Sequence, residues 1–397
     1  MGDTYINTRV HFSAMRRTNL QVRVMIQNLI HFILEALKKL IAFIKGFFVT
    51  KETIRFNNGQ AVVINYKLAE GGFSYIYCAS DIPNLNATRF HRPRQYALKR
   101  IQCLDNEMVI KCEQEALVHS KINSQYCLPL YTMQFMNDKK VCYMLFPLIQ
   151  GGSLRDEVSR RRLLENHMYE NIKPFKERQV LKLFRGIVSG VKAVHDAGFA
   201  HCDVKLENIL LDTTKSQRDE EMGHGIGSST IGTPVLMDFG SARELSIKLV
   251  DRRTVLNLVE EATQNSTISY RAPELFEGGC RHGPLEADVD GKVDVWSLGC
   301  VLYAMMFGSS PFEIEYRKDD GSIRIVDCTQ LRIINGNIPF PPKNSPRGNL
   351  FSYNFEMHEL IEWMLTVDRT TRPNIDQVFS RIEQMNQIES KRMHNIV

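Results

Sequence analysis

Two short polar segments constrain the fold of this chain more than any other feature. Residues 201–208 read HCDVKLEN, and residues 238–240 read DFG. Asp203 can orient a hydroxyl group and accept its proton, and Lys205 can place a cation beside it. Two further residues of these segments offer oxygen ligands for magnesium, namely Asn208 and Asp238. These groups can act together only in a fold that holds the two segments against each other.

The size and charge of the chain suit a globular protein with an extension. Its 397 residues are 43% hydrophobic and 24% charged, which allows two lobes and an additional segment. A net charge of +5 is too small to indicate a nucleic-acid partner, and we expect none. The nine cysteines include no CxxC pair, so they indicate neither a zinc site nor a disulfide framework. Cysteines without such a pattern favour a reducing, cytoplasmic compartment.

Residues 22–49 are mostly apolar, with polar side chains three to four positions apart. This spacing predicts an amphipathic helix with a narrow polar stripe. If this helix crossed a bilayer, Glu35, Lys38 and Lys39 would lie near its middle. Inserting each of these charges costs about 2.5 to 3.5 kcal/mol, so a helix on the membrane surface is favoured over a transmembrane one. Basic residues around it could attract anionic lipids. The alternatives are packing on the rest of the chain or on a second copy, and an organelle transit segment.

The remaining pattern predicts a small β-rich unit followed by a larger helical one. Strands are expected over 61–68, 75–79, 95–101, 130–134 and 141–148, with a helix over 111–122 and a loop over 81–94. Helices are expected next over 177–198, 293–307 and 360–365, with a Gly/Ser-rich insertion over 212–233.

The first turn of the β-rich unit, residues 68–76, reads LAEGGFSYI. Gly71 and Gly72 let backbone N–H groups approach a phosphate closely. Phe73 could cap the phosphates, while Leu68 and Ile76 could contact an adenine ring. Alone, this turn could equally be an ordinary hairpin.

Lys99 closes a Tyr-Ala-Leu-Lys strand that follows this turn. A lysine at this place can contact the α- and β-phosphates of ATP and pair with a carboxylate on the next helix. We choose Glu115 as that carboxylate because it precedes a small residue and lies one helical turn before His119, on the face of the helix that is expected to point to the core. Glu113 stays open as the alternative.

Phe146-Pro147-Leu148-Ile149 ends the last strand of the unit and is expected to contact adenine. The carbonyl of Pro147 and the N–H of Ile149 are candidates for hydrogen bonds to the base, and Phe146 would be a bulky residue at the back of the pocket. Ala97 and Leu210 complete the predicted nucleotide-binding set.

Taken in this order, the motifs resemble those of protein kinases. The resemblance implies an α+β fold, the bilobal kinase domain, over residues 54–385, with a β-rich N-lobe over about 54–150 and a helical C-lobe over about 151–385. An N-terminal extension over 1–53 and a short tail over 386–397 would flank it. The expected activity is phosphoryl transfer from ATP, with Mg²⁺, to a protein Ser/Thr hydroxyl. A pseudokinase scaffold and a membrane-tethered trafficking adaptor are the competing hypotheses.

Within the resemblance, Asp203 is the expected base, Lys205 the cation at the transferred phosphate, and Asn208 and Asp238 the metal ligands. A lysine two positions after the base favours Ser/Thr over Tyr substrates. Other residues have architectural roles: Thr267 would support the substrate-binding loop, Glu274 would pair with Arg372, and Asp294 would brace the catalytic loop.

Cys202 departs from the pattern, because most kinases carry Arg at this position. A cysteine has no positive charge, so it cannot pair with a phosphorylated residue of the activation segment as the usual Arg does. We therefore hypothesise that packing rather than phosphate orders this segment. The alternative is that Cys202 only fills a small gap.

Long strings at residues 68–75, 234–241, 267–276 and 294–308 resemble the numb-associated kinase family. The last two look most like its myristoylated and palmitoylated Ser/Thr kinase. The resemblance implies a kinase of the secretory or endocytic membrane system, peripheral on Golgi or endosomal membranes, with a helical insertion over 251–263 of the activation segment.

The acylation signals of that relative are not matched. Gly2 is followed by Asp3, Ile6 stands where Ser or Thr is preferred, and the first cysteine is Cys78. Residues 22–49 could take over the membrane contact instead.

Overall fold

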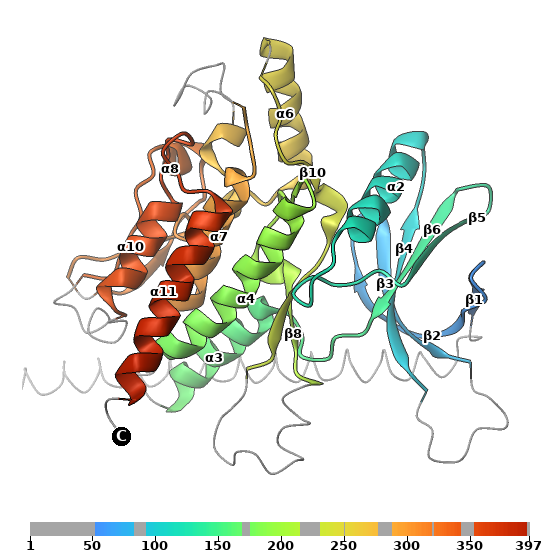
Figure 1. The fold of residues 1–397 in the computed structure, drawn as a ribbon, viewed down its shortest axis with the longest axis horizontal. Coiled ribbons are helices and arrows are strands. Elements are labelled where there is room, and N and C mark those ends of the chain that lie inside the picture. The colour runs from blue at the N-terminus through green and yellow to red at the C-terminus, as the bar shows by residue number, and fades with distance from the viewer. Residues whose placement is uncertain are drawn as a thin grey trace, which may run out of the picture.

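The computed structural model describes two lobes, one built on a sheet and one built mainly of helices (Figure 1). The described residues are 52–82, 93–168, 175–214, 231–249, 251–276, 288–319, 321–342 and 353–394. The expected helix over 22–49, most of the loop over 81–94 and most of the insertion over 212–233 lie outside them.

The sheet lobe is a six-stranded antiparallel sheet with the strand order β1-β2-β3-β4-β6-β5. The strands are β1 (Thr53–Arg55), β2 (Ala61–Glu70), β3 (Ser74–Asp81), β4 (Gln95–Gln102), β5 (Thr132–Met136) and β6 (Val141–Pro147). Alternating side chains such as Val62, Leu98 and Leu145 are fully buried and form the core of one face. The five predicted strands are present, and β1 is an addition.

Helix α2 (Asn106–Lys121) covers the other face of this sheet and carries the predicted Glu115 and His119. It begins five residues before the predicted helix, because the side chain of Asp105 accepts a hydrogen bond from the Met108 N–H and caps it. Its buried residues recur on one side, which lies toward the sheet and toward Phe239–Ser241 of the helical lobe.

The helical lobe surrounds α7 (Lys292–Phe307), whose side chains are buried all round apart from the first. Around it lie α3 (Leu154–Met168), α4 (Glu177–Asp196), α6 (Arg252–Asn265), α8 (Gln330–Ile334), α10 (Phe355–Met364) and α11 (Ile375–His394). The predicted helices correspond to α4, α7 and α10, while α3, α8 and α11 were not predicted. Helix α11 continues past the expected domain end at 385.

Short strand pairs position the polar segments. Strand β8 (Ile209–Asp212) pairs with β9 (Thr233–Leu236), so that residues 201–208 and 238–240 emerge side by side. Strand β7 (Phe199–Ala200) pairs with β10 (Arg243–Glu244) just beyond, and β11 (Ile314–Tyr316) pairs with β12 (Ile323–Ile325) farther along the chain.

Helix α6 is the expected insertion of the activation segment, and it projects from the helical lobe beyond β10 (Figure 1). Asp251 caps it by accepting a hydrogen bond from the Thr254 N–H at 2.8 Å. Its Leu258 and Ala262 are buried against the lobe. Within the described ranges, no helix combines the length and apolarity needed to cross a membrane.

Behind this segment, Glu274 and Arg372 form the expected buried ion pair. The two terminal guanidinium nitrogens of Arg372 donate to the two carboxylate oxygens of Glu274 at 2.7 and 2.9 Å. The pair connects the end of the activation segment to the start of α11 through a bidentate contact.

Candidate active site

Asp294 of α7 holds the backbone of the catalytic loop, as the sequence indicated. Its carboxylate oxygens accept hydrogen bonds from the His201 N–H at 2.7 Å and the Cys202 N–H at 2.8 Å. Nε2 of His195 lies 2.8 Å from the same carboxylate. Burial opposes a charge on Asp294, yet these hydrogen bonds outweigh it and lower its pKa.

Two residues of the site have left-handed backbone conformations that are rare outside glycine. Cys202 and Asp238 both have φ of 66°. The surrounding structure must hold such conformations in place, and for Cys202 the hydrogen bond to Asp294 does so. The strain therefore lies in the two segments that carry the predicted chemistry.

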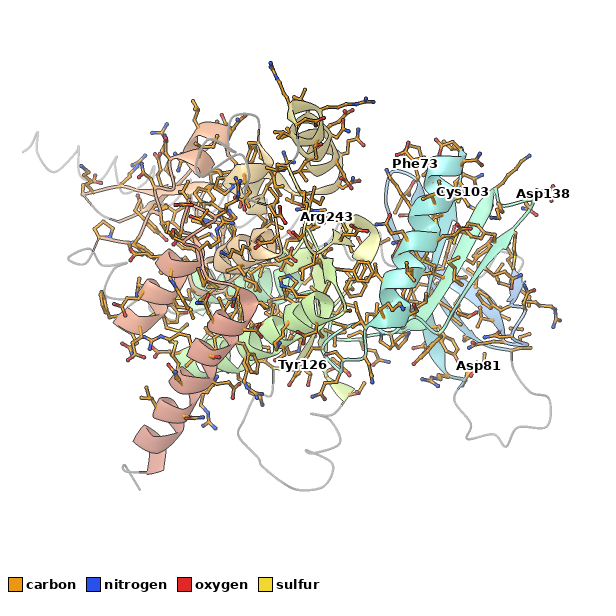
Figure 2. The ribbon with its side chains drawn as sticks, turned by 45° about the horizontal axis from the view of Figure 1, so that its top comes forward. Phe73, Asp81, Cys103, Tyr126, Asp138 and Arg243 are labelled. Atoms are coloured by element: carbon orange, nitrogen blue, oxygen red, sulfur yellow. The ribbon has the colours of Figure 1, made fainter. Side chains whose placement is uncertain are left out.

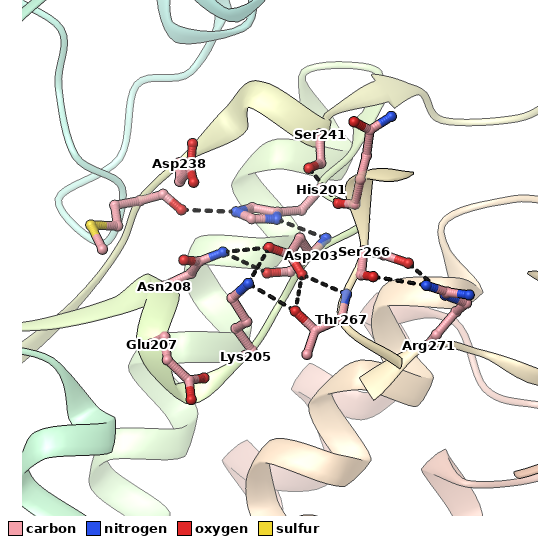
Figure 3. A network of polar contacts seen from close by, with 12 residues as sticks. His201, Asp203, Lys205, Glu207, Asn208, Asp238, Ser241, Ser266, Thr267 and Arg271 are labelled. Carbon is pink, nitrogen blue, oxygen red and sulfur yellow. Dashed lines mark hydrogen bonds and ion pairs between the residues drawn. The ribbon is translucent and has the colours of Figure 1, made fainter. Parts of the chain in front are cut away.

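Asp203 is the centre of a closed polar network (Figure 3). One oxygen accepts from Nζ of Lys205 at 2.6 Å and from Nδ2 of Asn208 at 3.0 Å. The other accepts from the N–H and hydroxyl of Thr267, at 3.1 and 3.0 Å. Lys205 also donates to the Thr267 hydroxyl at 2.8 Å, which closes the ring. Both oxygens of Asp203 are thereby fixed in direction.

Lys99 bridges the two lobes. Its Nζ lies 2.8 and 3.0 Å from the oxygens of Glu115 and 3.2 Å from Oδ1 of Asp238. Burial works against the charge on Lys99, but Asp238 and Glu115 outweigh it and raise the pKa. Glu113 pairs instead with Lys139 at the surface, at 3.1 Å, so the geometry selects Glu115.

An aromatic stack runs through the same boundary. The ring of Phe239 lies 4.7 Å from that of His119 on α2 and 5.3 Å from that of His201, between centroids. His119 also lies 5.3 Å from Phe146. Burial lowers the pKa of His119 to about 4, so it is neutral at pH 7. The sequence had marked His119 only as core-facing.

The predicted adenine-contacting residues gather where the lobes meet. Phe146 is buried, and Ala97, Ile149 and Leu210 pack against the same apolar cluster from both lobes. Ile76 lies opposite Lys99 in the pairing of β3 with β4, and Pro147 lies opposite Tyr96 at the end of β6.

The glycine-rich turn leaves its own side chains exposed. The Gly71 N–H donates to the Ser74 carbonyl at 2.8 Å and closes the turn. Leu68 and Phe73 are 43% and 57% exposed, which leaves both free to cover a ligand. Figure 2 shows Phe73 on the side of the sheet lobe that faces the helical lobe.

The predicted magnesium ligands have the right donor atoms. Nδ2 of Asn208 donates to the carbonyl and the carboxylate of Asp203, so the amide oxygen is the end that can bind a cation. Asp238 is half-exposed, and Lys99 lowers its pKa to about 2, so it is ionised at pH 7. A carboxylate and an amide oxygen are hard ligands of the kind that Mg²⁺ prefers.

Cys202 lies beside a cation that the sequence did not predict. Nε of Arg243 on β10 donates to its sulfur at 3.0 Å, and burial raises the pKa of Cys202 to about 12. Arg243 is 7% exposed and lies near the base of α6 (Figure 2). Its two terminal nitrogens have no hydrogen-bond partner among the described residues. The neutral thiol of Cys202 is therefore in contact with the guanidinium group of Arg243 on β10.

Comparison with known proteins matches the description "Protein kinase domain" over residues 67–381. Serine/threonine-protein kinase 16 of Homo sapiens is 34% identical over 338 residues, covering 84% of this chain and 93% of the human protein. Serine/threonine-protein kinase ppk13 of Schizosaccharomyces pombe is 27% identical over 360 residues, covering 83% and 92%. Serine/threonine-protein kinase ENV7 of Saccharomyces cerevisiae is 27% identical over 367 residues, covering 84% and 94%.

Proposed function

The chain belongs to the protein kinase family, and on that premise we propose how its own residues perform phosphoryl transfer. It is a Ser/Thr protein kinase that uses ATP with Mg²⁺ and acts on protein serine and threonine. The proposal assigns roles to individual side chains of the domain over 54–385. One observation carries it: Asp203 lies in a closed network with Lys205, Asn208 and Thr267.

Asp203 is the base in this proposal. Four hydrogen bonds fix its two oxygens, so it can orient the substrate hydroxyl and accept the proton as the oxygen attacks phosphorus. Lys205 lies within 2.6 Å of that carboxylate and would shift to the transferred phosphoryl group, where its charge stabilises the transition state. Thr267 keeps both groups next to the segment that supports the substrate.

Lys99 would contact the α- and β-phosphates, held in place by Glu115. Asn208 and Asp238 would hold Mg²⁺, which when bound neutralises charge on the phosphate oxygens. Gly71, Gly72 and Phe73 would cover the phosphates. Adenine would lie among Leu68, Ile76, Ala97, Phe146 and Leu210, with hydrogen bonds to the backbone of Pro147 and Ile149.

The catalytic loop is ordered without a phosphate in this proposal. Asp294 accepts hydrogen bonds from the backbone N–H groups of His201 and Cys202, and Thr267 binds Asp203 directly. Cys202 takes its hydrogen bond from Arg243 rather than offering a cation to a phosphorylated residue. Packing and these contacts can therefore keep the site assembled.

We further propose that the chain falls in the numb-associated family and is cytoplasmic and peripheral on Golgi or endosomal membranes. The strings at 267–276 and 294–308 support the family, and the amphipathic pattern of residues 22–49 supports the membrane contact. The competing hypothesis for residues 22–49 is packing against protein.

Transfer of radiolabel from ATP to a protein substrate tests the roles. Wild type should label serine and threonine, while Asp203→Ala should lose about two to four orders of magnitude in rate. Lys121→Ala, at the exposed end of α2, is a matched surface control and should keep the wild-type rate. Equal labelling by wild type and Asp203→Ala would replace the enzyme hypothesis with the pseudokinase scaffold.

A further inference from the structure

Arg155 of α3 links the catalytic loop to the segment that supports the substrate. Its Nε donates to Oε1 of Glu207 at 2.7 Å, and one terminal nitrogen donates to the Tyr270 hydroxyl at 3.0 Å. Glu207 is two residues after Lys205, and Tyr270 is three residues after Thr267. One side chain therefore joins three separate elements next to Asp203.

The location places this cluster beside the reacting hydroxyl. Lys205 and Thr267 both contact Asp203, and their two segments continue to Glu207 and Tyr270. Figure 3 shows Glu207 on the same loop as Asp203 and Lys205. The Glu207 side chain is 45% exposed and that of Arg155 is 27% exposed, so a substrate peptide held at Asp203 can reach them.

Arg155 supplies the positive charge that balances the carboxylate of Glu207. Oε2 of Glu207 is buried and accepts no hydrogen bond from the residues that the structure describes. Arg155 is the cation bound to the other oxygen. Without Arg155, an uncompensated carboxylate would lie beside the acceptor site, and it would attract lysine or arginine in a substrate.

We propose that Arg155 is a specificity-determining residue, which neutralises Glu207 so that the enzyme does not select substrates with a basic residue next to the acceptor. The proposal rests on the kinase activity described above. Tyr270 holds Arg155 in this position: its hydroxyl accepts from the guanidinium, and its carbonyl accepts from Ser297 at 2.8 Å. The wild-type enzyme therefore accepts neutral and basic residues next to the acceptor serine or threonine equally.

The test compares kcat/KM for a serine peptide with alanine at the flanking positions and for the same peptide with arginine placed at each of them in turn. In wild type the ratio of arginine to alanine peptide should stay near one. In Arg155→Gln it should rise roughly fivefold at one or two positions. Adding Glu207→Gln should return it to the wild-type ratio. Arg160→Gln is the matched control, because Arg160 lies on the same helix and binds Glu157 instead.

Two results would overturn the proposal: a ratio unchanged by Arg155→Gln, or a rise that persists after Glu207→Gln. If Arg155→Gln is inactive on all peptides, the swap of Arg155→Glu with Glu207→Arg decides. Recovered activity with the wild-type ratio supports the pairing, and an inactive swap contradicts it. Failure of wild type to phosphorylate any peptide or protein would instead refute the proposed function.

Discussion

His119 is a buried imidazole in a position that links the two lobes. It touches Phe146 on one side and Phe239 on the other, and its Nε2 has no hydrogen-bond partner among the described residues. A proton on this ring would place an unpaired charge in an apolar stack near Lys99. Neutral His119 is therefore a condition for the assembled site.

Stability should consequently fall as the pH drops from about 6.5 to about 4. The ordinary pKa of 6.5 is lowered to about 4 in the folded protein, so the unfolded chain binds more protons in this window. The loss should reach about 3 kcal/mol at the acid end. Thermal melting of wild type and His119→Leu across this range measures it. The variant should lack this part of the pH dependence, and parallel curves for the two proteins would contradict the prediction.

The residues that the sequence could identify are those whose spacing along the chain is set by one loop or strand. Asp203, Lys205 and Asn208 share a loop, so their spacing alone indicated a common site. The roles of Arg243 and Arg155 were not predicted, because their partners, Cys202 and Glu207, are far from them in the sequence. Such contacts depend on the packing of whole elements, which a local pattern does not encode.

At the scale of elements, periodicity located the strands and the strongly apolar helices. Helix α4 buries one broad face, and α7 is buried all round, so both gave clear patterns. Over residues 154–162 of α3, the buried apolar side chains are Leu154 and Val158, and several arginines obscure the apolar pattern. Helix α11 does carry apolar residues three to four apart at Ile375, Val378, Ile382 and Met385, a signal that could have predicted it.

The amphipathic element over 22–49 should bring the kinase to anionic membranes. Full-length protein should co-sediment with vesicles that contain phosphatidylserine, because apolar side chains enter the interface while lysine and arginine contact the headgroups. A chain that starts at Lys51 should stay in the supernatant, and added salt should weaken the binding of the full-length chain. Equal partitioning of the two proteins would favour packing of this segment against protein.

At the scale of the whole molecule, two sets of contacts join the lobes in an assembled state. Lys99 binds Glu115 in the sheet lobe and Asp238 in the helical lobe. The stack of His119, Phe239 and His201 spans the same boundary. Both sets are made by side chains of the chain itself. We therefore propose that this Ser/Thr kinase is active without phosphate on its activation segment.

The most direct test is the initial rate of peptide phosphorylation by protein freed of phosphate. Phosphatase-treated protein, with the phosphatase removed and the absence of phosphate verified by intact mass, is compared with untreated protein, and Asp203→Ala serves as the blank. We predict equal initial rates for the treated and untreated proteins, with no lag, because Asp294 and Thr267 already order the catalytic loop. A treated protein as inactive as the blank, or one that gains activity only after a lag of autophosphorylation, would contradict the account.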